Sequence, residues 1–281
     1  MGRRGATRTL RVTRYREGGA ERVRESLAVE EPLEIRVAWT VPGGERRSEQ
    51  LTVTMRTPGD DFDLVAGFLF AEGVVSGRDE LGELTYCRGD DTQEYNVVEA
   101  RLRAGVGFDA PSHRRHFMTS SSCGVCGKAS LDAVADTGCV VLPGGTVRVE
   151  PALLPDLPRR LRDRQEGFHR TGGLHAAGLF TPEGELVDLR EDVGRHNAVD
   201  KVLGHEFLGP GLPATERVLV VSGRTSFEII QKAVRAGVPV VVAVGAPSSL
   251  AVELARRFGQ TLVGFARDGG FNVYAGAERL G

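Results

Sequence analysis

The chain has 281 residues, of which 41% are hydrophobic and 26% are charged, and its formal net charge is −2. These values are typical of a soluble globular protein with one large core or two domains, and they argue against a general nucleic-acid-binding protein. The four cysteines and the lack of an apolar run of about 18 residues lead us to expect a cytoplasmic protein with reduced thiols and no membrane segment.

The N-terminal region is rich in arginine. Residues 1–24 carry eight arginines against two glutamates and few apolar side chains. This composition predicts a basic, disordered tail over residues 1–28, with an anion-binding arm as the alternative.

Residues 29–150 show mainly the alternation of β-strands. Apolar residues alternate with polar ones from Leu33 to Trp39 and again from Leu51 to Met55, which predicts a hairpin with one buried face. A helical spacing follows over residues 64–73. Further strands are expected over residues 84–88, 95–103 and 140–149, the last with a turn at residues 143–145. An arginine-rich surface helix is expected over residues 151–164.

The segment 117–128 holds two thiols, Cys123 and Cys126, among serines and glycines, and precedes a short predicted helix. Gly124 and Gly127 favour a loop. The start of the helix and Lys128 favour the thiolate form, which attacks sulfur. The pattern therefore indicates thiol chemistry.

Other uses of this cysteine pair remain open. A structural zinc half-site or a disulfide is possible in principle, but four-thiolate zinc sites have two such pairs, whereas Cys87 and Cys139 stand alone. The His-x-Glu and Pro-Cys-x-x-Cys motifs of zinc deaminases are missing from the sequence. A thioredoxin-like redox pair is a further alternative, although its cysteines belong after an early strand.

The C-terminal half alternates strands with helices. Strands are predicted over residues 218–221, 238–244 and 261–265, and helices over residues 226–236 and 249–258, which favours a parallel or mixed sheet covered by helices. The loops 222–226 and 245–249 follow the first two strands. Backbone amides at such helix starts, with Arg224, Thr225 and Ser226 in the first loop, predict a phosphate-bearing, nucleotide-like ligand.

Between the halves, a strand-like segment over residues 172–180 precedes a polar segment over residues 191–201. The polar segment combines acidic, basic and amide groups with His196 at the start of a predicted helix. We expect these groups to project into a cleft, or to form a solvated helix start stabilised by charge pairs. His196 or His175 is a candidate proton shuttle.

Several of these motifs together resemble the formate dehydrogenase accessory sulfurtransferase family, FdhD. The resemblance rests on residues 57–73, 121–127, 171–177, 191–201, 222–228 and 262–267, and it spans nearly the whole chain after the basic tail. It implies a sulfurtransferase with a cysteine persulfide intermediate, in which Cys123 carries the sulfur and Cys126 is auxiliary.

The resemblance also implies the partners. Sulfur would come from a cysteine desulfurase and pass to the Mo-bis(molybdopterin guanine dinucleotide) cofactor that formate dehydrogenase requires, with a guanine nucleotide binding as a fragment of that cofactor. The expected cofactor-binding residues are Phe265, Ala266, Arg267, Asp268, Gly269 and Gly270, together with Arg224, Thr225, Ser226 and His196. No structural metal and no nucleic acid are expected, and the chain is expected to be a homodimer.

The implied fold class is α/β, α+β overall. A cytidine-deaminase-like α/β/α domain is expected over residues 151–281. A smaller β-rich domain over residues 29–150 would end with the Cys-x-x-Cys loop and its short helix.

Two rival functions use the same motifs. A nucleotide- or molybdopterin-binding regulatory module would not need the thiols, whereas a dithiol oxidoreductase would need both and would cycle a disulfide.

Overall fold

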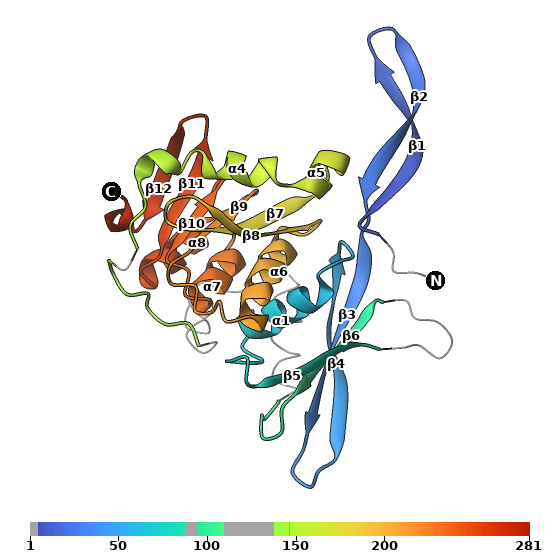
Figure 1. The fold of residues 1–281 in the computed structure, drawn as a ribbon, viewed down its shortest axis with the longest axis vertical. Coiled ribbons are helices and arrows are strands. Elements are labelled where there is room, and N and C mark those ends of the chain that lie inside the picture. Colours follow the sequence, from blue (N-terminus) through green and yellow to red (C-terminus); the bar gives the residue numbers. More distant parts are fainter. Residues whose placement is uncertain (1–4, 88–94, 110–137, 146) are drawn as a thin grey trace.

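The chain begins with an antiparallel ribbon that stands apart from the rest of the molecule (Figure 1). The structure is a computed structural model, and it describes residues 5–87, 95–109, 138–145 and 147–281. Strands β1 (Thr7–Arg16) and β2 (Gly19–Ala28) pair along their whole length. The prediction of a disordered tail is therefore wrong for residues 7–28. Alternating apolar residues in both strands give the ribbon one partly apolar face, which the excess of arginine conceals in the composition.

A four-stranded sheet follows, in the order β4-β3-β6-β5. Its strands are β3 (Glu31–Thr40), β4 (Arg46–Arg56), β5 (Leu81–Tyr86) and β6 (Val97–Leu102). The predicted hairpin is confirmed as β3–β4, and Leu33, Ile35 and Val37 are fully buried. Helix α1 (Asp61–Ala71), also predicted, packs against this sheet through its apolar stripe.

The second half forms a six-stranded sheet in the order β12-β11-β10-β9-β7-β8. Strands β9 (Val218–Val221), β10 (Val240–Ala243) and β11 (Thr261–Arg267) are parallel, whereas β7 (His175–Phe180), β8 (Leu186–Asp192) and β12 (Gly270–Ala275) are antiparallel to their neighbours. The sheet is mixed, as the alternation of strands and helices predicts.

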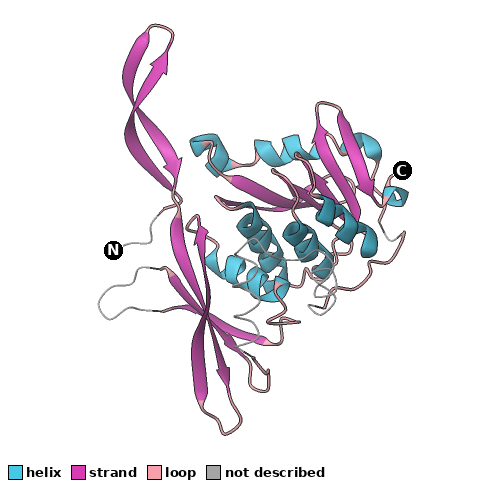
Figure 2. Ribbon diagram, turned by 180° about the vertical axis from the view of Figure 1, so that it is seen from behind, coloured by secondary structure: helices cyan, strands magenta, loops and turns pink. Residues whose placement is uncertain are grey.

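Helices cover both faces of this sheet (Figures 1 and 2). On one face lie α6 (Arg195–Leu208), α7 (Phe227–Arg235) and α8 (Ser249–Arg257), and on the other lie the short helix η1 (Pro151–Leu153), α4 (Leu157–Asp163) and α5 (Glu166–Thr171). Alternate residues of the central strands point into two cores: Leu219 and Val241 pack under α6–α8, and Val220 packs under α4. The short helix η2 (Ala277–Arg279) ends the chain.

A close contact between α1 and α6 joins the two sheets, and two glycines make this contact possible. A Cβ on Gly67 would lie 1.9 Å from the backbone oxygen of Asp200, and one on Gly204 would lie 1.8 Å from the backbone oxygen of Asp63. Only glycine allows the two helix backbones to approach this closely. The N-terminal sheet is thereby held against the larger one.

The prediction for residues 140–149 is wrong in the part that the structure describes. Val140 and Val141 are about two-thirds exposed (68% and 67%), and Val149 makes only an isolated bridge with Leu280. A segment with an apolar alternation forms a strand only where a neighbouring strand can make backbone hydrogen bonds to it. The sequence pattern alone does not show whether such a neighbour is present. The expected arginine-rich surface helix is found as α4, with Leu157 and Leu161 facing the core.

Within the described chain, none of the helices combines the length and apolar character needed to cross a bilayer.

Candidate functional site

Three loops meet at the carboxyl ends of β9, β10 and β11. The amide of Gly245 donates to the carbonyl oxygen of Gly223 (3.1 Å), and the amide of Ser248 donates to that of Thr225 (3.0 Å). The amide of Phe265, in β11, donates to the carbonyl oxygen of Gly245 (3.2 Å). The two predicted helix-start loops and the stretch 265–270 therefore lie side by side.

Small residues make this meeting possible. A Cβ on Gly245 would lie 2.9 Å from Cγ of Arg224, and one on Gly264 would lie 3.0 Å from the carbonyl oxygen of Gly245. Arg224 thus packs its stem against the second loop, and the residue as a whole is exposed. Thr225, in contrast, is buried beneath the loops, at 1% exposure.

The stretch 265–270 has an unusual backbone. Phe265 and Asp268 have φ of 53° and 51°, in the left-handed region that non-glycine residues avoid, and Gly269 has φ of 77°. The pairing of β11 with β12 is irregular between Gly264 and Arg267. Phe265 is 38% exposed as a residue, and Cζ of Arg267 lies 6.0 Å from the centroid of its ring. Such strain is often retained at binding sites.

A cleft of about 1000 Å³ separates this stretch from the helical layer above it. One wall comes from η1 and α4 and includes Asp156, Arg159 and Arg162. The other wall comes from the sheet edge: Val244, Ala266, Arg267, Asp268, Gly269 and Phe271. Three arginines facing one cleft make it suitable for a polyanion, because guanidinium groups bind phosphate oxygens in pairs.

The two arginines of α4 were not predicted as site residues. Their sequence pattern is that of a surface helix, and only the fold places that helix over the strand ends. Hydrogen bonds from Arg160 and Arg159 lower the pKa of Asp156, so its carboxylate stays ionised. This carboxylate orients the guanidinium groups of Arg159 and Arg160, of which Arg159 lines the cleft.

A second hollow of about 380 Å³ continues the cleft along the sheet edge. It shares Pro158, Arg162 and Val244 with the first and adds Gln165, Phe168, Gly172, Gly173, Leu174, His175, Val193 and Ser222. The two hollows therefore adjoin, and Arg267 lines only the first of them.

Two histidines lie close to this edge. His196, in the first turn of α6, has Nε2 2.8 Å from Oγ of Ser226 and 3.3 Å from a carboxylate oxygen of Glu228. Burial, and then the nearby cation of Arg195, lower the pKa of His196 to about 4, so its ring is neutral at neutral pH. Burial and Arg195 also lower the pKa of His175, whose Nδ1 lies 3.5 Å from Oγ of Ser222.

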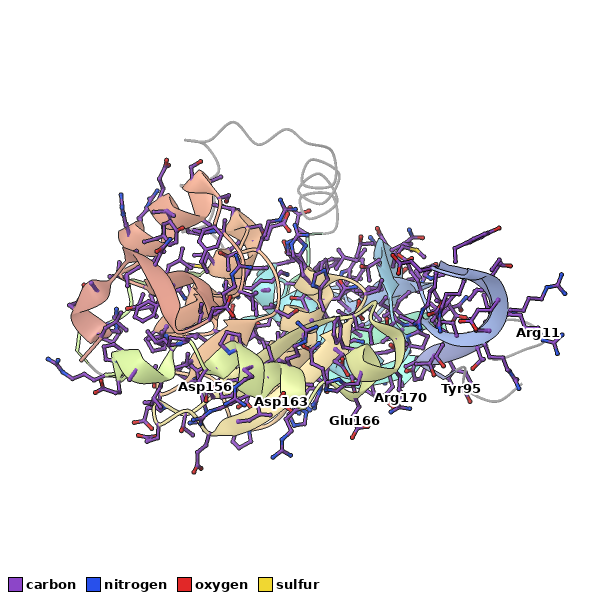
Figure 3. The ribbon with its side chains drawn as sticks, turned by 90° about the horizontal axis from the view of Figure 1, so that it is seen from above. Arg11, Tyr95, Asp156, Asp163, Glu166 and Arg170 are labelled. Atoms are coloured by element: carbon purple, nitrogen blue, oxygen red, sulfur yellow. The ribbon has the colours of Figure 1, made fainter. Side chains whose placement is uncertain are left out.

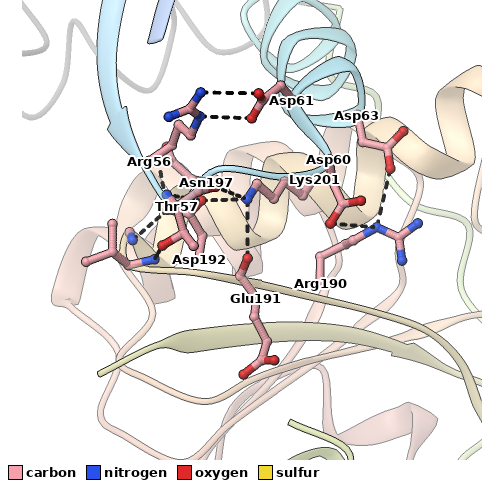
Figure 4. Close-up of polar contacts among 12 residues, drawn as sticks. Arg56, Thr57, Asp60, Asp61, Asp63, Arg190, Glu191, Asp192, Asn197 and Lys201 are labelled. Atoms are coloured by element: carbon pink, nitrogen blue, oxygen red, sulfur yellow. Dashed lines mark hydrogen bonds and ion pairs between the residues drawn. The ribbon is translucent and has the colours of Figure 1, made fainter. Parts of the chain in front are cut away.

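Four other polar groups of residues 191–201 are buried and line neither hollow: Asp192, Asn197, Asp200 and Lys201. Asp192 and Lys201 form a buried ion pair of 2.7 Å, and Lys201 also donates to the carbonyl oxygen of Thr57 (2.9 Å) (Figure 4). Asn197 donates to the carbonyl oxygen of Met55 (2.7 Å). For these buried groups neither a cleft nor solvent exposure is found, because they tie the end of β4 to α6, although the predicted charge pair is present between Asp192 and Lys201.

The expected cysteine carriers, Cys123 and Cys126, lie outside the described residues. Cys87 is half-buried and Cys139 is buried. In the residues that the structure describes, there is no group of three or more histidine, cysteine, aspartate or glutamate side chains placed to hold a metal ion.

Comparisons with known proteins agree on one family over most of the chain. The model of the FdhD/NarQ family matches residues 28–281. The sulfur carrier protein FdhD of Streptomyces avermitilis is 53% identical over 100% of this chain and 97% of its own length. The protein of the same name from Mycobacterium tuberculosis is 50% identical over 91% of this chain and 92% of its own.

A solved structure shares the fold. The crystal structure of a candidate formate dehydrogenase accessory protein from Desulfotalea psychrophila superposes with a TM-score of 0.74 at 25% identity, covering 98% of this chain and 99% of the other. The family match covers all of the described chain except the β1–β2 ribbon and its flanks, and it includes the three loops at the sheet edge. The chain therefore belongs to the FdhD/NarQ family.

Proposed function

We propose that the protein is a sulfurtransferase that accepts sulfur from a cysteine desulfurase on Cys123 and passes it to the Mo-bis(molybdopterin guanine dinucleotide) cofactor required by formate dehydrogenase. The observation that carries the proposal is the match, over 100% and 91% of the chain, to two relatives named sulfur carrier protein FdhD. The arginine-lined cleft supports it, because the proposed recipient is a polyanion.

The sulfur transfer needs one thiolate. The Cys123 sulfur attacks the outer sulfur of the donor persulfide, the donor's sulfur–sulfur bond breaks, and the donor cysteine leaves as a thiolate. The product is a Cys123 persulfide, whose outer sulfur is then the one delivered. Cys126 is the auxiliary thiol of this step.

The cleft would hold the recipient by its nucleotide ends. Arg267 and the arginines of α4 would bind pyrophosphate oxygens, with Arg224, Thr225 and Ser226 supplying the neighbouring helix start and His196 a neutral imidazole. A guanine nucleotide would then bind alone as a fragment. The cytidine-deaminase-like character of the large domain, the cytoplasmic location and the homodimer remain predictions.

Intact-mass analysis tests the proposal directly. After incubation with a cysteine desulfurase and cysteine, the wild-type protein should gain the mass of one or more sulfur atoms, and Cys123→Ala should not. Cys123→Ala should also abolish the maturation of formate dehydrogenase in a strain that lacks the wild-type protein, and Cys126→Ala should be milder. Cys139→Ala is the matched control.

The rival binding-module function predicts a different result. The same cleft would serve a nucleotide- or molybdopterin-binding module with a dithiol redox role. If Cys123→Ala supported full maturation, the carrier assignment and the dithiol redox role would both fall, and a binding module that does not need the thiols would remain.

A further inference from the structure

Arg195, the first residue of α6, is a partly buried arginine that the proposed function does not yet use. Its Nε is buried and has no hydrogen-bond partner among the residues that the structure describes. The acidic residues that precede it are engaged elsewhere: Asp192 pairs with Lys201 at 2.7 Å, and Glu191 accepts from two amides at the start of α5 (2.7 and 2.8 Å). The charge of Arg195 is therefore free to attract an anion, and the positive end of the α6 dipole adds to it.

Two side chains from different elements meet over Gly223, in the loop after β9. A Cβ on Gly223 would lie 3.4 Å from both Nδ1 and Cε1 of His175, and 3.8 Å from Cδ of Arg195. After burial, the charge of Arg195 is the largest cause that lowers the pKa of His175 and that of His196. Both rings are neutral at neutral pH, so they offer hydrogen-bonding nitrogen atoms while Arg195 supplies the charge.

Ser222 determines which nitrogen of His175 carries the proton. The Oγ of Ser222 accepts a hydrogen bond from the amide of Ala176 (2.9 Å) and lies 3.5 Å from Nδ1 of His175. Because this oxygen already accepts a hydrogen, its own hydroxyl donates to Nδ1, which leaves the proton of His175 on Nε2. His175 and Ser222 both line the second hollow. The Nε2–H group of His175 is therefore a neutral donor for a ligand in that hollow.

The two hollows offer anions two separate places. Helices α4 and α5 follow one another along them, as four labelled residues show: Asp156, Asp163, Glu166 and Arg170 (Figure 3). Arg159 and Arg267 line the first hollow only, and Arg162 lines both. Arg195 lies at the border of the second hollow, beside His175 and over Gly223. A ligand that occupies both hollows would meet positive charge at each of its ends.

We propose that Arg195, with His175 and Ser222, forms a second anion site which, given the proposed function, takes the anionic metal end of the recipient while the arginines of the first hollow hold its phosphates. The recipient is negative both at its pyrophosphates and at its metal end, so two sites fix its position more firmly than one. A charged guanidinium beside a neutral N–H donor suits the oxygen and sulfur ligands of a metal.

Titration with molybdate tests the second site in the full chain. The protein is isotopically labelled at its histidine nitrogens and saturated with guanosine diphosphate, so that the first hollow is filled. Sodium molybdate should then shift the ring signals of His175 and His196 in NMR spectra, and leave those of His205, near the far end of α6, in place. Arg195→Met should weaken molybdate binding roughly tenfold or more, and should change the affinity for guanosine diphosphate less than about twofold.

Arg217→Met is the matched control. Arg217 also has a buried Nε that lacks a partner in the described chain, but it stands just before β9, at the end of that strand opposite Gly223. His175→Phe keeps a ring and removes the donor, so it should weaken molybdate binding severalfold, as read from His196. Unchanged molybdate affinity in Arg195→Met or in His175→Phe would overturn the proposal, and so would an equal loss in Arg217→Met.

The complete cofactor distinguishes its metal end from a free oxyanion. Its addition should displace both molybdate and guanosine diphosphate from the wild type. Molybdate that stays bound beside the cofactor would overturn the assignment to the metal end. Failure of guanosine diphosphate to bind the wild type would count against the proposed function, whereas the absence of molybdate binding that depends on Arg195 would count against the second site.

Discussion

At the scale of single residues, the main stabilising feature between the two sheets is a buried polar network around Asp192 and Lys201. The carboxylate of Asp192 accepts hydrogen bonds from the amides of Thr57 (3.1 Å) and Gly194 (2.8 Å) and from Asn197 (3.1 Å), besides its ion pair with Lys201. A buried carboxylate whose hydrogen bonds are satisfied in this way fixes the groups around it. The sequence shows these residue types but not their partners, which lie up to 144 positions apart.

Removing one member of the buried pair should be severe. Lys201→Met leaves the fully buried Asp192 carboxylate without its counter-ion, so we expect the free energy of unfolding to fall by about 3–5 kcal/mol. Urea denaturation of the wild type and of Lys201→Met measures this loss of unfolding free energy. Arg170→Gln breaks the exposed pair with Glu166 (3.2 Å) and should cost less than about 1 kcal/mol. Equal losses in the two variants would mean that the buried pair adds nothing particular.

The neutral state of His196 gives stability a dependence on pH. The pKa of His196 falls from its ordinary 6.5 to about 4 on folding. Below pH 6.5 the unfolded chain therefore takes up a proton that folded His196 does not, and the unfolding free energy declines as the pH falls toward 4. Above pH 6.5 this contribution to the pH dependence vanishes.

The variant His196→Gln isolates this effect. It removes the titrating ring, so its unfolding free energy should change less between pH 7 and pH 5 than that of the wild type. Denaturant titrations of both proteins at each pH provide the comparison. Parallel pH profiles would show that His196 ionises equally in both states.

Affinity for a nucleotide tests the arginines at the sheet edge. Arg267→Ala and Arg224→Ala should each weaken guanosine diphosphate binding by roughly 1.5–3 kcal/mol, the scale of a hydrogen bond to a charged group. Calorimetry measures the loss, and Arg47→Ala on the exposed edge of β4 is the control. Unchanged affinity in one of the two variants would remove that arginine from the site.

At the scale of elements, the crossing of α1 and α6 depends on glycine. Gly67→Ala or Gly204→Ala would place a methyl group within 2 Å of backbone oxygen, so the helices must separate. We expect a loss of stability of at least about 1–3 kcal/mol, the usual cost of overpacking, measured as a lower denaturation midpoint. Gly144→Ala, which meets no atom within 4 Å, is the control and should have little effect.

Elements with a strong period were predictable from the sequence, and those decided by tertiary context were not. The alternation of β3 and the helical spacing of α1 each specify one buried face, and the structure has both. Residues 140–149 have a suitable pattern but no ladder to join, and the ribbon has a weak pattern masked by arginine. The convergence of the three loops followed from the order of parallel strands, whereas the place of α4 above them required the fold.

At the scale of the whole molecule, the two sheets are joined by α1, α6 and the buried polar network. The predicted domains, residues 29–150 and 151–281, meet across this contact, and their boundaries remain a prediction. The cleft is bounded by segments from residues 151 to 271, so its geometry belongs to the larger sheet and its helices. The smaller sheet supports α6, which carries His196.

The hydrogen bonds between Thr57 and the distant residues Asp192 and Lys201 also set the order of events during synthesis. These bonds span 135 and 144 residues, so the end of β4 leaves the ribosome long before its partners exist. At a translation rate of roughly 5–20 residues per second, the buried backbone of Thr57 waits on the order of 7 to 30 s for these partners. During that time helix α1, which packs on the first sheet, has no α6 to cover its other side. Newly made protein is therefore most exposed to aggregation and to chaperones while its second half is still being translated.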